Sequence, residues 1–359
     1  MKTIYVDNAA TTRLSDVAYE AMKPMMQEIY GNPSSLHHIG QIAKEHLDDA
    51  RARVAKCINA NPNEIYFTSG GSEADNQAIL TAAYNGAKRG KKHIISSKFE
   101  HHAVLHTLDK LKKEGFEIQL LDVYNNGIVK VDDVKKAIRQ DTALVTIMTA
   151  NNEVGTVQPI KEIGEICKEN NVVFHTDAVQ AVGHIPVDVK DLGVDMLSVS
   201  GHKFHGPKGV GFLYCRKGIL LQNLINGGAQ ERGKRAGTEN MASIVGMAAA
   251  LEDACANLDK NAKYVSKIRD KIIDGVSDIE MCKLNGDREH RLPGTINFSF
   301  EGIEGEGLLL LLDQDGICAS SGSACTSGSL DPSHVLLSMG VPVESAHGSL
   351  RLSLCEHNT

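Results

Sequence analysis

Short apolar, β-branched runs alternate with longer stretches of helical periodicity between residues 64 and 211. The short runs predict buried strands, and stretches whose apolar positions recur every three or four residues predict helices. The predicted strands are Glu64–Phe67, His93–Ser96, Glu117–Leu121, Ala143–Thr149, Val172–Thr176, Met196–Ser200 and Gly209–Tyr214. The predicted helices between them are Ser72–Arg89, His102–Glu114, Val131–Arg139 and Ile160–Glu169. This alternation predicts an α/β fold whose largely parallel sheet is covered by helices on both faces.

A different pattern begins near residue 241. A helix rich in small residues is predicted over Met241–Leu258, and an amphipathic helix follows over Ala262–Val276. Further elements are predicted at Thr295–Phe300 (strand), Gly305–Asp315 (helix) and Gly348–Leu354 (strand). We therefore expect a large domain over residues 16–256 and a smaller α+β domain over residues 1–15 and 257–359.

Composition excludes several classes of protein. The net charge of -7 argues against a nucleic-acid or anionic-membrane surface. No apolar run approaches the roughly 20 residues of a membrane span, and Asp7 interrupts any signal-like segment. The 8 cysteines form no Cys-x-x-Cys pair and are expected to be reduced thiols. A cytoplasmic protein is the resulting expectation.

The segment Ser200–Gly209 carries a lysine between two histidines, directly after a predicted strand. A lysine partly removed from water has a lowered pKa and becomes a nucleophilic amine. Lys203 would then form a Schiff base with an aldehyde, and pyridoxal phosphate is the usual aldehyde cofactor. The alternative is a glycine turn that happens to carry a lysine.

The loop Thr68–Asn76 joins a predicted strand to a predicted helix. Free N–H groups and the dipole at a helix start favour a phosphate. The loop lacks the Gly-x-x-x-x-Gly-Lys-Ser/Thr pattern of nucleotide-binding loops. The alternative is a plain N-cap in which Ser72 bonds its own helix.

Histidines follow the next predicted strand. His101 suits stacking on a planar cofactor or acid–base chemistry, because the pKa of histidine lies near neutrality. A solvated loop histidine is the alternative. His102 and His106 lie four residues apart, as metal ligands on a helix do, but no carboxylate completes a His-Glu-x-x-His pattern. No resident metal is expected.

Polar residues also end two central strands. Asn152 follows an apolar run and suits donation to a phenolate or carboxylate oxygen, although this motif taken alone favours an Asn-rich turn. Asp177 ends the strand Val172–Thr176, where a buried carboxylate needs a partner. A pyridinium nitrogen is one such partner, and a helix cap or salt bridge is the alternative.

Three later residues complete the candidates. Thr238 lies at a predicted helix start, where it would donate a hydrogen bond to a phosphate or simply cap the helix. Arg351, between serines on a predicted strand, suits bidentate binding of a carboxylate or a structural ion pair. Cys325 lies in the small-residue loop Ser320–Gly328, which suits an accessible nucleophilic thiol or a passive loop cysteine.

Taken together, these motifs resemble the class V aminotransferase group of pyridoxal-phosphate enzymes, and within it the NifS/IscS type of cysteine desulfurase. The motifs occur in the family order and span nearly the whole chain. They are Tyr5–Thr12, Gly31–Ser35, Thr68–Asn76, Glu100–His102, Asn151–Glu153, Asp177–Gln180, Ser200–Gly209, Glu231–Arg232, Arg235–Asn240 and Ser320–Gly328. The resemblance implies an aspartate-aminotransferase-like large domain with a mainly parallel seven-stranded sheet, beside a smaller domain.

The resemblance also implies roles around the cofactor ring. Lys203 forms the Schiff base and moves the Cα proton, and Asp177 pairs with the pyridinium nitrogen. His101 stacks on the ring and takes part in proton transfer. Gln180 and Asn152 bond near the ring hydroxyl.

By the same resemblance, Arg351 and Asn152 hold the substrate carboxylate. The cofactor phosphate is held by Gly71, Ser72, Ser200 and His202. Thr238 reaches the phosphate of a neighbouring subunit, so a homodimer is implied. Cys325 attacks the sulfur of L-cysteine and becomes a persulfide, and the resemblance allows it to contact a cluster during transfer. The implied acceptor is an iron–sulfur scaffold protein or a transfer-RNA thiolation enzyme.

Two departures from the family pattern bear on activity. Family members often continue past the arginine strand, whereas this sequence ends at Thr359, and Cys355 stands where a glycine is usual.

Alternative functions are a selenocysteine lyase, a related aminotransferase, and a non-catalytic assembly partner of a sulfur pathway. The substitution Cys325→Ala separates a cysteine desulfurase from an aminotransferase, because an aminotransferase needs no thiol and should remain active.

Overall fold

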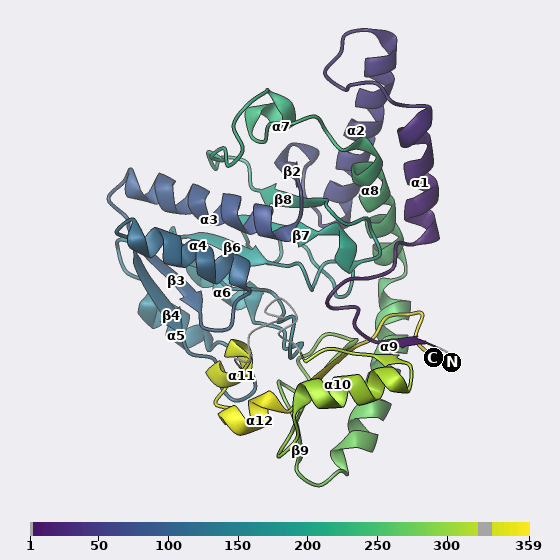
Figure 1. Ribbon diagram of the computed structural model, residues 1–359. Coiled ribbons are helices and arrows are strands. Elements are labelled where there is room, and N and C mark those ends of the chain that lie inside the picture. Colours follow the sequence, from purple (N-terminus) through teal and green to yellow (C-terminus); the bar gives the residue numbers. More distant parts are fainter. Residues whose placement is uncertain (1–2, 322–331) are drawn as a thin grey trace.

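The computed structural model describes residues 3–321 and 332–359 (Figure 1). Its largest sheet has seven strands in the order β2-β8-β7-β6-β5-β3-β4. In chain order these strands are β2 (Ile65–Thr68), β3 (His93–Ser97), β4 (Glu117–Leu121), β5 (Thr142–Thr146), β6 (Val173–Asp177), β7 (Met196–Ser200) and β8 (Gly211–Cys215). Strand β8 is antiparallel to both neighbours, and the other pairs are parallel. The predicted mainly parallel seven-stranded sheet is confirmed.

Helices bury both faces of this sheet, as the alternating pattern predicts. Leu144 belongs to one buried cluster and Val145 to another, because successive side chains of a strand point to opposite faces. Residues of α3 (Gly71–Ala87) and α4 (His102–Lys113) lie in the first cluster. The second cluster contains residues of α2 (His38–Cys57), α5 (Val131–Ala137), α6 (Ile160–Glu169) and α8 (Met241–Ala256).

Sequence periodicity did not predict the helices α1 (Asp16–Gln27) and α2, which pack against α8. The small residues of α8 permit this close approach. A Cβ atom at Gly246 would lie 2.5 Å from Cγ of Met22 in α1. The backbones of α1 and α8 can therefore approach only because position 246 carries no side chain.

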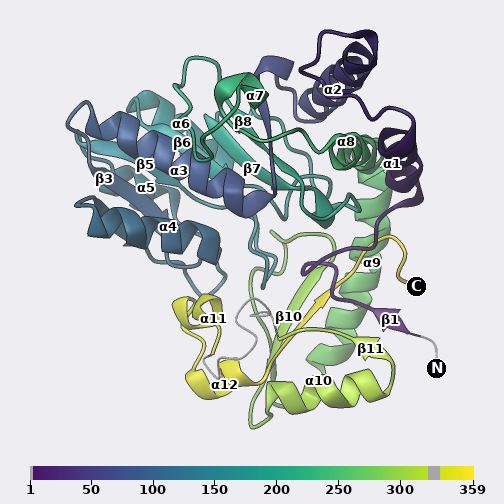
Figure 2. The ribbon, with the colours of Figure 1, turned by 45° about the horizontal axis from the view of Figure 1, so that its top comes forward.

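A second region contains two small sheets. Strand β1 (Ile4–Tyr5) pairs with β11 (Ile317–Cys318), and β10 (Thr295–Phe300) lies between β9 (Cys282–Leu284) and β12 (Ser349–Ser353). These strands, α9 (Leu258–Ser277) and α10 (Gly305–Gln314) lie below the large sheet in Figure 1, and Figure 2 shows them on the same side. A separate buried cluster joins Val6, Val265 and Phe298. This cluster supports the division at residues 15 and 256, which remains a prediction.

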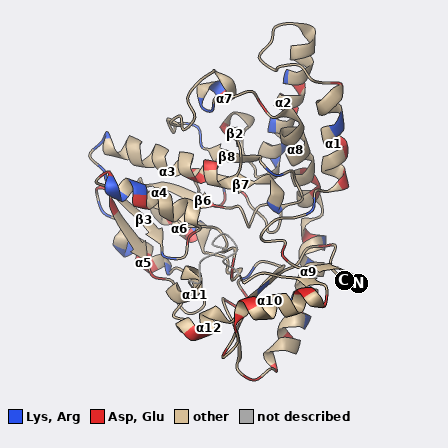
Figure 3. Ribbon diagram, in the orientation of Figure 1, with Lys and Arg blue, Asp and Glu red and all other residues tan. Residues whose placement is uncertain are grey.

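Several boundaries differ from those predicted. Strand β5 ends at Thr146, not Thr149, and α9 begins at Leu258, directly after α8 ends at Ala256. The remaining short elements are η1 (Pro62–Glu64), η2 (Gly201–Lys203), α7 (Gln230–Gly233), α11 (His334–Ser338) and α12 (Val343–His347). Among the described residues no single helix meets the length and hydropathy of a membrane span; α8 and α9 meet them only jointly, across a 72° bend. Acidic and basic residues are interspersed along the helices (Figure 3).

Candidate active site

A cavity of about 370 Å³ collects most of the predicted site residues at the carboxyl ends of the central strands. This is the edge where ligands bind on such sheets. The predicted residues that line it are Gly71, Ser72, His101, Asn152, Asp177, Gln180, Ser200, His202, Lys203 and Arg351. Only two predicted residues are absent from this set: Thr238 lies elsewhere, and Cys325 lies outside the described residues.

Lys203 reaches the cavity from the short turn η2 that follows strand β7. Its side chain is half-buried, and its Nζ atom donates hydrogen bonds to the carbonyl oxygens of Ala9 and Ala10, at 2.6 and 2.8 Å. Gln180 donates to the same oxygen of Ala9, at 3.0 Å. The N-terminal segment therefore positions the amine of Lys203.

The N-terminus of α3 opens into the cavity without a side-chain cap. Gly70 is the N-cap residue, with φ of 151°, and no side chain bonds the free N–H groups there. Ser72 lies inside the helix, so the interpretation of Ser72 as the cap is wrong. A Cβ atom at Gly71 would lie 2.5 Å from Cγ2 of Val179. Uncapped N–H groups and a glycine that admits close approach suit an anion.

Two further polar side chains adjoin this helix start. Ser200 ends strand β7 and is 5% exposed, and His202 lies in the next turn. The His202 ring contacts the hydroxyl of Thr11 at 3.1 Å. Burial and the neighbouring charge of Lys203 lower the pKa of His202 to about 4. His202 is therefore neutral near physiological pH, and it is suited to an anion as a hydrogen-bonding group without net charge.

Asp177 ends strand β6 and is almost fully buried. The N–H group of Val179 donates to its carboxylate at 2.9 Å. Burial raises the pKa of Asp177 to about 6, although the Val179 bond and the charge of Lys203 act in the opposite direction. A buried carboxylate at the cavity wall is suited to receive a cationic or N–H ligand group.

Asp75 is a site residue that the sequence analysis did not single out. It lies one turn after Gly71 on α3, is 1% exposed, and lines the same cavity. Its Oδ1 atom is buried without a hydrogen bond among the described residues, although His175 lies 3.6 Å away. Burial and the charge of Asp177 raise its pKa well above the usual value. An acidic residue on an otherwise apolar face of the helix is the signal that would have revealed it.

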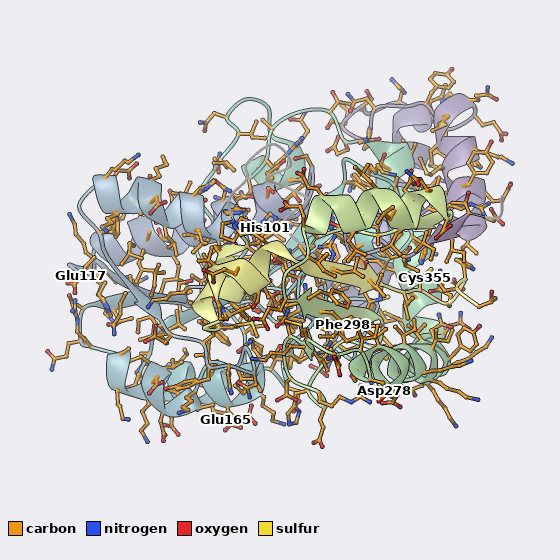
Figure 4. The ribbon with its side chains drawn as sticks, turned by 60° about the horizontal axis from the view of Figure 1, so that its bottom comes forward. His101, Glu117, Glu165, Asp278, Phe298 and Cys355 are labelled. Atoms are coloured by element: carbon orange, nitrogen blue, oxygen red, sulfur yellow. The ribbon has the colours of Figure 1, made fainter. Side chains whose placement is uncertain are left out.

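His101, labelled in Figure 4, is the N-cap residue of α4, with an extended backbone, and it lines the cavity. The N–H group of Ala103 donates to Nδ1 of His101 at 3.1 Å, which places the proton of the neutral ring on Nε2. Burial and the charge of Lys203 lower the pKa of His101 to about 4. The ring is therefore neutral at physiological pH and carries an N–H donor.

Glu100 fixes the loop that carries His101. Its carboxyl group accepts hydrogen bonds from the Met148 N–H group, at 3.1 and 3.0 Å, and from the Ser97 hydroxyl at 2.5 Å. Burial raises the pKa of Glu100 to about 8. The loop after β3 is thus tied to the segment after β5, which carries Asn152.

Arg351 enters the cavity from β12 and is 2% exposed. Its guanidinium donates to the Asp7 carboxylate at 2.8 Å and to the Asn152 carbonyl oxygen at 3.0 Å. These contacts place Arg351, the residue predicted to bind the substrate carboxylate, next to Asn152, which lines the same cavity. Arg351 also forms an ion pair with Asp7, as the alternative interpretation predicted.

The two described ends that flank residues 322–331 both lie beside this site. Ser320 exchanges backbone hydrogen bonds with Arg351, and Ser349 donates to the Ser321 carbonyl oxygen at 2.9 Å. On the other side, His334 donates to the Glu100 carbonyl oxygen at 3.0 Å. The segment that contains Cys325 therefore begins and ends next to residues that line or support the cavity.

Thr238 lies in a separate cavity of about 140 Å³, with Ser69 and Arg235 among its lining residues. It is exposed within one chain. The structure thus does not bring Thr238 to the Lys203 cavity, and its predicted role remains one that requires a second subunit.

Metal-ligating atoms also occur here. Those of Asp75, His101 and Asp177 lie within 4.8 Å of one another, a spacing that a metal ion could use. The ring of His102 lies 5.1 Å from that of His106 and 4.6 Å from that of His334, between centroids. The expectation of no resident metal remains a prediction.

Comparison with known proteins identifies the class that this fold and cavity define. The class-V aminotransferase family matches residues 4–359, and the chain belongs to that family. A Clostridium botulinum (strain Hall) protein named cysteine desulfurase IscS is 56% identical over 361 residues, covering 100% of this chain and 91% of its own. The predicted resemblance to NifS/IscS-type cysteine desulfurases is confirmed.

Solved structures agree. A NifS-like protein superposes with a TM-score of 0.94 at 42% identity, covering 100% of this chain and 95% of its own. SspA in complex with cysteine superposes with a TM-score of 0.88 at 36% identity, covering 99% of this chain and 100% of its own.

Proposed function

We propose that this chain is a cysteine desulfurase, which takes sulfur from L-cysteine, releases L-alanine and passes the sulfur to an acceptor. One observation carries this proposal: a single cavity brings together Lys203, Asp177 and Arg351. These residues supply an amine nucleophile, a buried carboxylate and a carboxylate-binding guanidinium. An amino-acid substrate needs all three kinds of group when an aldehyde cofactor is used.

We infer that the cavity takes pyridoxal 5′-phosphate, on which this family depends. The uncapped start of α3 suits the phosphate, with Gly71, Ser72, Ser200 and His202 around it. The buried carboxylates of Asp177 and Asp75 suit a protonated ring nitrogen. When bound, the cofactor supplies an electron sink for bond changes at the α- and β-carbons of an amino acid.

The chain's own residues orient the substrate and move its protons. Arg351 would hold the substrate carboxylate in bidentate geometry, with Asn152 beside it. Lys203 would carry the α-proton on Nζ, because its amine is already positioned by the carbonyl oxygens of Ala9 and Ala10. His101 is neutral, and its Nε2–H would hold a proton near the substrate.

Cys325 would accept the sulfur. Its thiolate attacks the substrate sulfur, an S–S bond forms, and the Cβ–S bond breaks with its electron pair passing to carbon. Protonation of that carbon yields the methyl group of alanine, so the step needs no external oxidant. The described flanks of the segment, Ser320 and His334, support this role because they lie beside Arg351 and Glu100.

We further propose a cytoplasmic homodimer in which Thr238 reaches the phosphate of the neighbouring subunit. The exposure of Thr238 within one chain supports this arrangement. An iron–sulfur scaffold protein or a thiolation enzyme would receive the persulfide sulfur.

The experiment measures alanine released from L-cysteine in the presence of a reductant, for the wild type, Cys325→Ala and the control Cys318→Ala. We expect alanine from the wild type and the control only. Equal alanine from Cys325→Ala would remove the thiol from the mechanism and favour an aminotransferase or lyase. Consumption of L-selenocysteine but not L-cysteine would favour a selenocysteine lyase.

A further inference from the structure

The turn that follows β12 presents a thiol, a carboxylate and an imidazole in three consecutive residues, Cys355, Glu356 and His357. Asn358 closes this turn: its N–H group donates to the Cys355 carbonyl oxygen at 3.1 Å, and its side-chain oxygen accepts from the Cys355 N–H group at 2.8 Å. Asn358 also donates to the carbonyl oxygen of Tyr5 at 2.8 Å. The turn is therefore held in a defined place.

His205 faces this turn from the segment that carries Lys203. It is 7% exposed and adopts a left-handed backbone with φ of 64°, which is uncommon for a residue with a side chain. Its Nδ1 atom lies 2.9 Å from the carbonyl oxygen of Arg13. A carbonyl oxygen only accepts, so Nδ1 carries the proton and Nε2 of the neutral ring carries a lone pair.

The Nε2 atom of His205 is buried and makes no hydrogen bond among the described residues. Its nearest charged neighbour is the Glu356 carboxylate, at 3.5 Å. The His357 ring lies 5.3 Å away between centroids. The ligand atoms of His205, Glu356 and His357 all lie within 4.8 Å of one another.

A fourth candidate ligand belongs to the same turn. Cys355 is buried and directly precedes Glu356 in the sequence. A cavity of about 30 Å³ borders His205, Cys355 and Glu356. That volume is close to the space of one water molecule, so it has room for a single ion.

We propose that His205, Cys355, Glu356 and His357 bind one Zn²⁺ ion. Thiolate, imidazole and carboxylate are the ligands that zinc takes in proteins, and four of them complete a tetrahedral site. Ligand atoms about 2.0–2.3 Å from zinc lie about 3.3–3.8 Å apart in a tetrahedron. The ligand atoms of His205, Glu356 and His357 lie within 4.8 Å of one another, and side-chain rotation brings them into this range. The Cys355 thiol lies outside that set and joins it by rotating toward the cavity that it lines. The Nδ1 bond of His205 to a backbone carbonyl is the usual orienting contact of a zinc-bound histidine.

The site would fasten the C-terminal turn to the catalytic segment. His205 lies two residues after Lys203, and His184 Nε2 donates to the Lys203 carbonyl oxygen at 2.9 Å on the same side. Cys355 and His101 lie well apart in Figure 4, so the zinc site is distinct from the group that lines the active cavity at His101. Its predicted role is structural.

An ion pair without metal is the competing state. Burial opposes charge on His205, but the Cys355 thiol and the Glu356 carboxylate raise its pKa to about 10. A protonated His205 would form an ion pair with Glu356, and its buried Nε2 atom would then need no metal ion. Metal binding must release that proton, so zinc affinity decides between the two states.

The test measures Zn²⁺ binding to the cofactor-loaded full chain by competition with a chromophoric chelator. All proteins carry Cys325→Ala, so that the active-site thiol contributes no binding. We expect one bound Zn²⁺ per chain. Cys355→Ser and His357→Asn should each weaken the affinity by more than about tenfold, since even an outer-sphere partner contributes that much. Cys282→Ser, a matched change of a partly buried thiol, should leave it unchanged.

Substitution with Co²⁺ adds a spectroscopic readout. We expect a thiolate-to-cobalt charge-transfer band in the near ultraviolet that Cys355→Ser abolishes and Cys282→Ser retains. His357 is exposed, so His357→Asn tests the site without disturbing the core. No saturable Zn²⁺ binding, or equal affinity in the ligand variants and the control, would overturn the proposal in favour of the ion pair.

Discussion

The ammonium group of Lys203 donates a hydrogen bond of 2.6 Å to the carbonyl oxygen of Ala9, a residue 194 positions earlier in the chain. Two residues before Ala9, the carboxylate of Asp7 accepts from Arg351 at 2.8 Å. The N–H group of Ala9 donates to the Ser353 hydroxyl, at 2.8 Å, on the strand that carries Arg351. One short N-terminal segment therefore sets the amine and the guanidinium at a fixed separation.

The first prediction concerns Asp7, which positions Arg351. Asp7→Asn removes the charge that holds the guanidinium, and hydrogen bonds to charged groups contribute about 1.5–3 kcal/mol. We expect KM for L-cysteine to rise about tenfold or more, with a smaller change in kcat. Asp16→Asn is the control, because its pair with Arg13 is 88% and 81% exposed and should contribute little. An unchanged KM in Asp7→Asn would contradict the prediction.

A second prediction tests the phosphate end of the cavity. Gly71→Ala places a Cβ atom 2.5 Å from Cγ2 of Val179, so the helix start must shift. We expect the affinity for pyridoxal 5′-phosphate to fall more than about tenfold, because the N–H groups at the helix start then move from the phosphate. Val179→Ala removes the obstructing methyl groups.

The double variant Gly71→Ala/Val179→Ala should therefore recover much of the affinity lost in Gly71→Ala. Cofactor titration by fluorescence quenching measures each step of the cycle. Additive losses in the double variant would show that the two side chains do not act on each other.

A third prediction concerns a buried ion pair beneath the sheet edge. Arg51 and Glu231 form two contacts of 2.7 Å, and the Glu231 carboxylate also accepts from the Phe67 N–H group at 3.0 Å. Arg51→Met leaves an uncompensated buried carboxylate and should lower the free energy of unfolding by about 3–5 kcal/mol. Arg53→Ala, which breaks a more exposed pair with Glu252, should cost less than about 1 kcal/mol. Urea denaturation of both variants measures the difference, and equal losses would refute it.

The fourth prediction is a pH dependence of stability. His175 is fully buried between Thr146 and Ser198, and burial lowers its pKa from the ordinary 6.5 to about 3. The unfolded chain therefore binds more protons than the folded chain between these two pH values. His175 contributes stability that is present above about pH 6.5 and is lost as the pH falls toward about 3.

Replacement by His175→Gln removes this titration and retains polar atoms for both hydroxyl partners. We expect the wild type to lose about 2 kcal/mol more stability than the variant between pH 7 and pH 5. Urea midpoints at the two pH values provide the measurement. Parallel losses in the two proteins would mean that His175 does not titrate abnormally.

Local patterns were sufficient for much of the fold. Strands Glu117–Leu121, Met196–Ser200 and Thr295–Phe300 have the predicted bounds, as does helix Ile160–Glu169. Helix Ile160–Glu169 buries one apolar face, whereas strands Met196–Ser200 and Thr295–Phe300 are short runs buried at every position. The prediction that β5 extends to Thr149 failed, because the regular strand register ends at Thr146, although Ile147 and Thr149 still donate backbone hydrogen bonds to β6. The helices α1 and α2 depend on packing against α8, which lies more than 180 residues away in the sequence.

The sequence by itself determined the sheet, its mainly parallel order and the polar residues that end its strands, because alternation and strand-end chemistry are local properties of the chain. Only the tertiary structure decided which of these residues share a cavity. It placed Asp75 beside Asp177, Ala9 against Lys203 and Asp7 against Arg351, and it left Thr238 in a different cavity. Those relationships join segments that are distant in sequence, and long-range packing alone sets their separations.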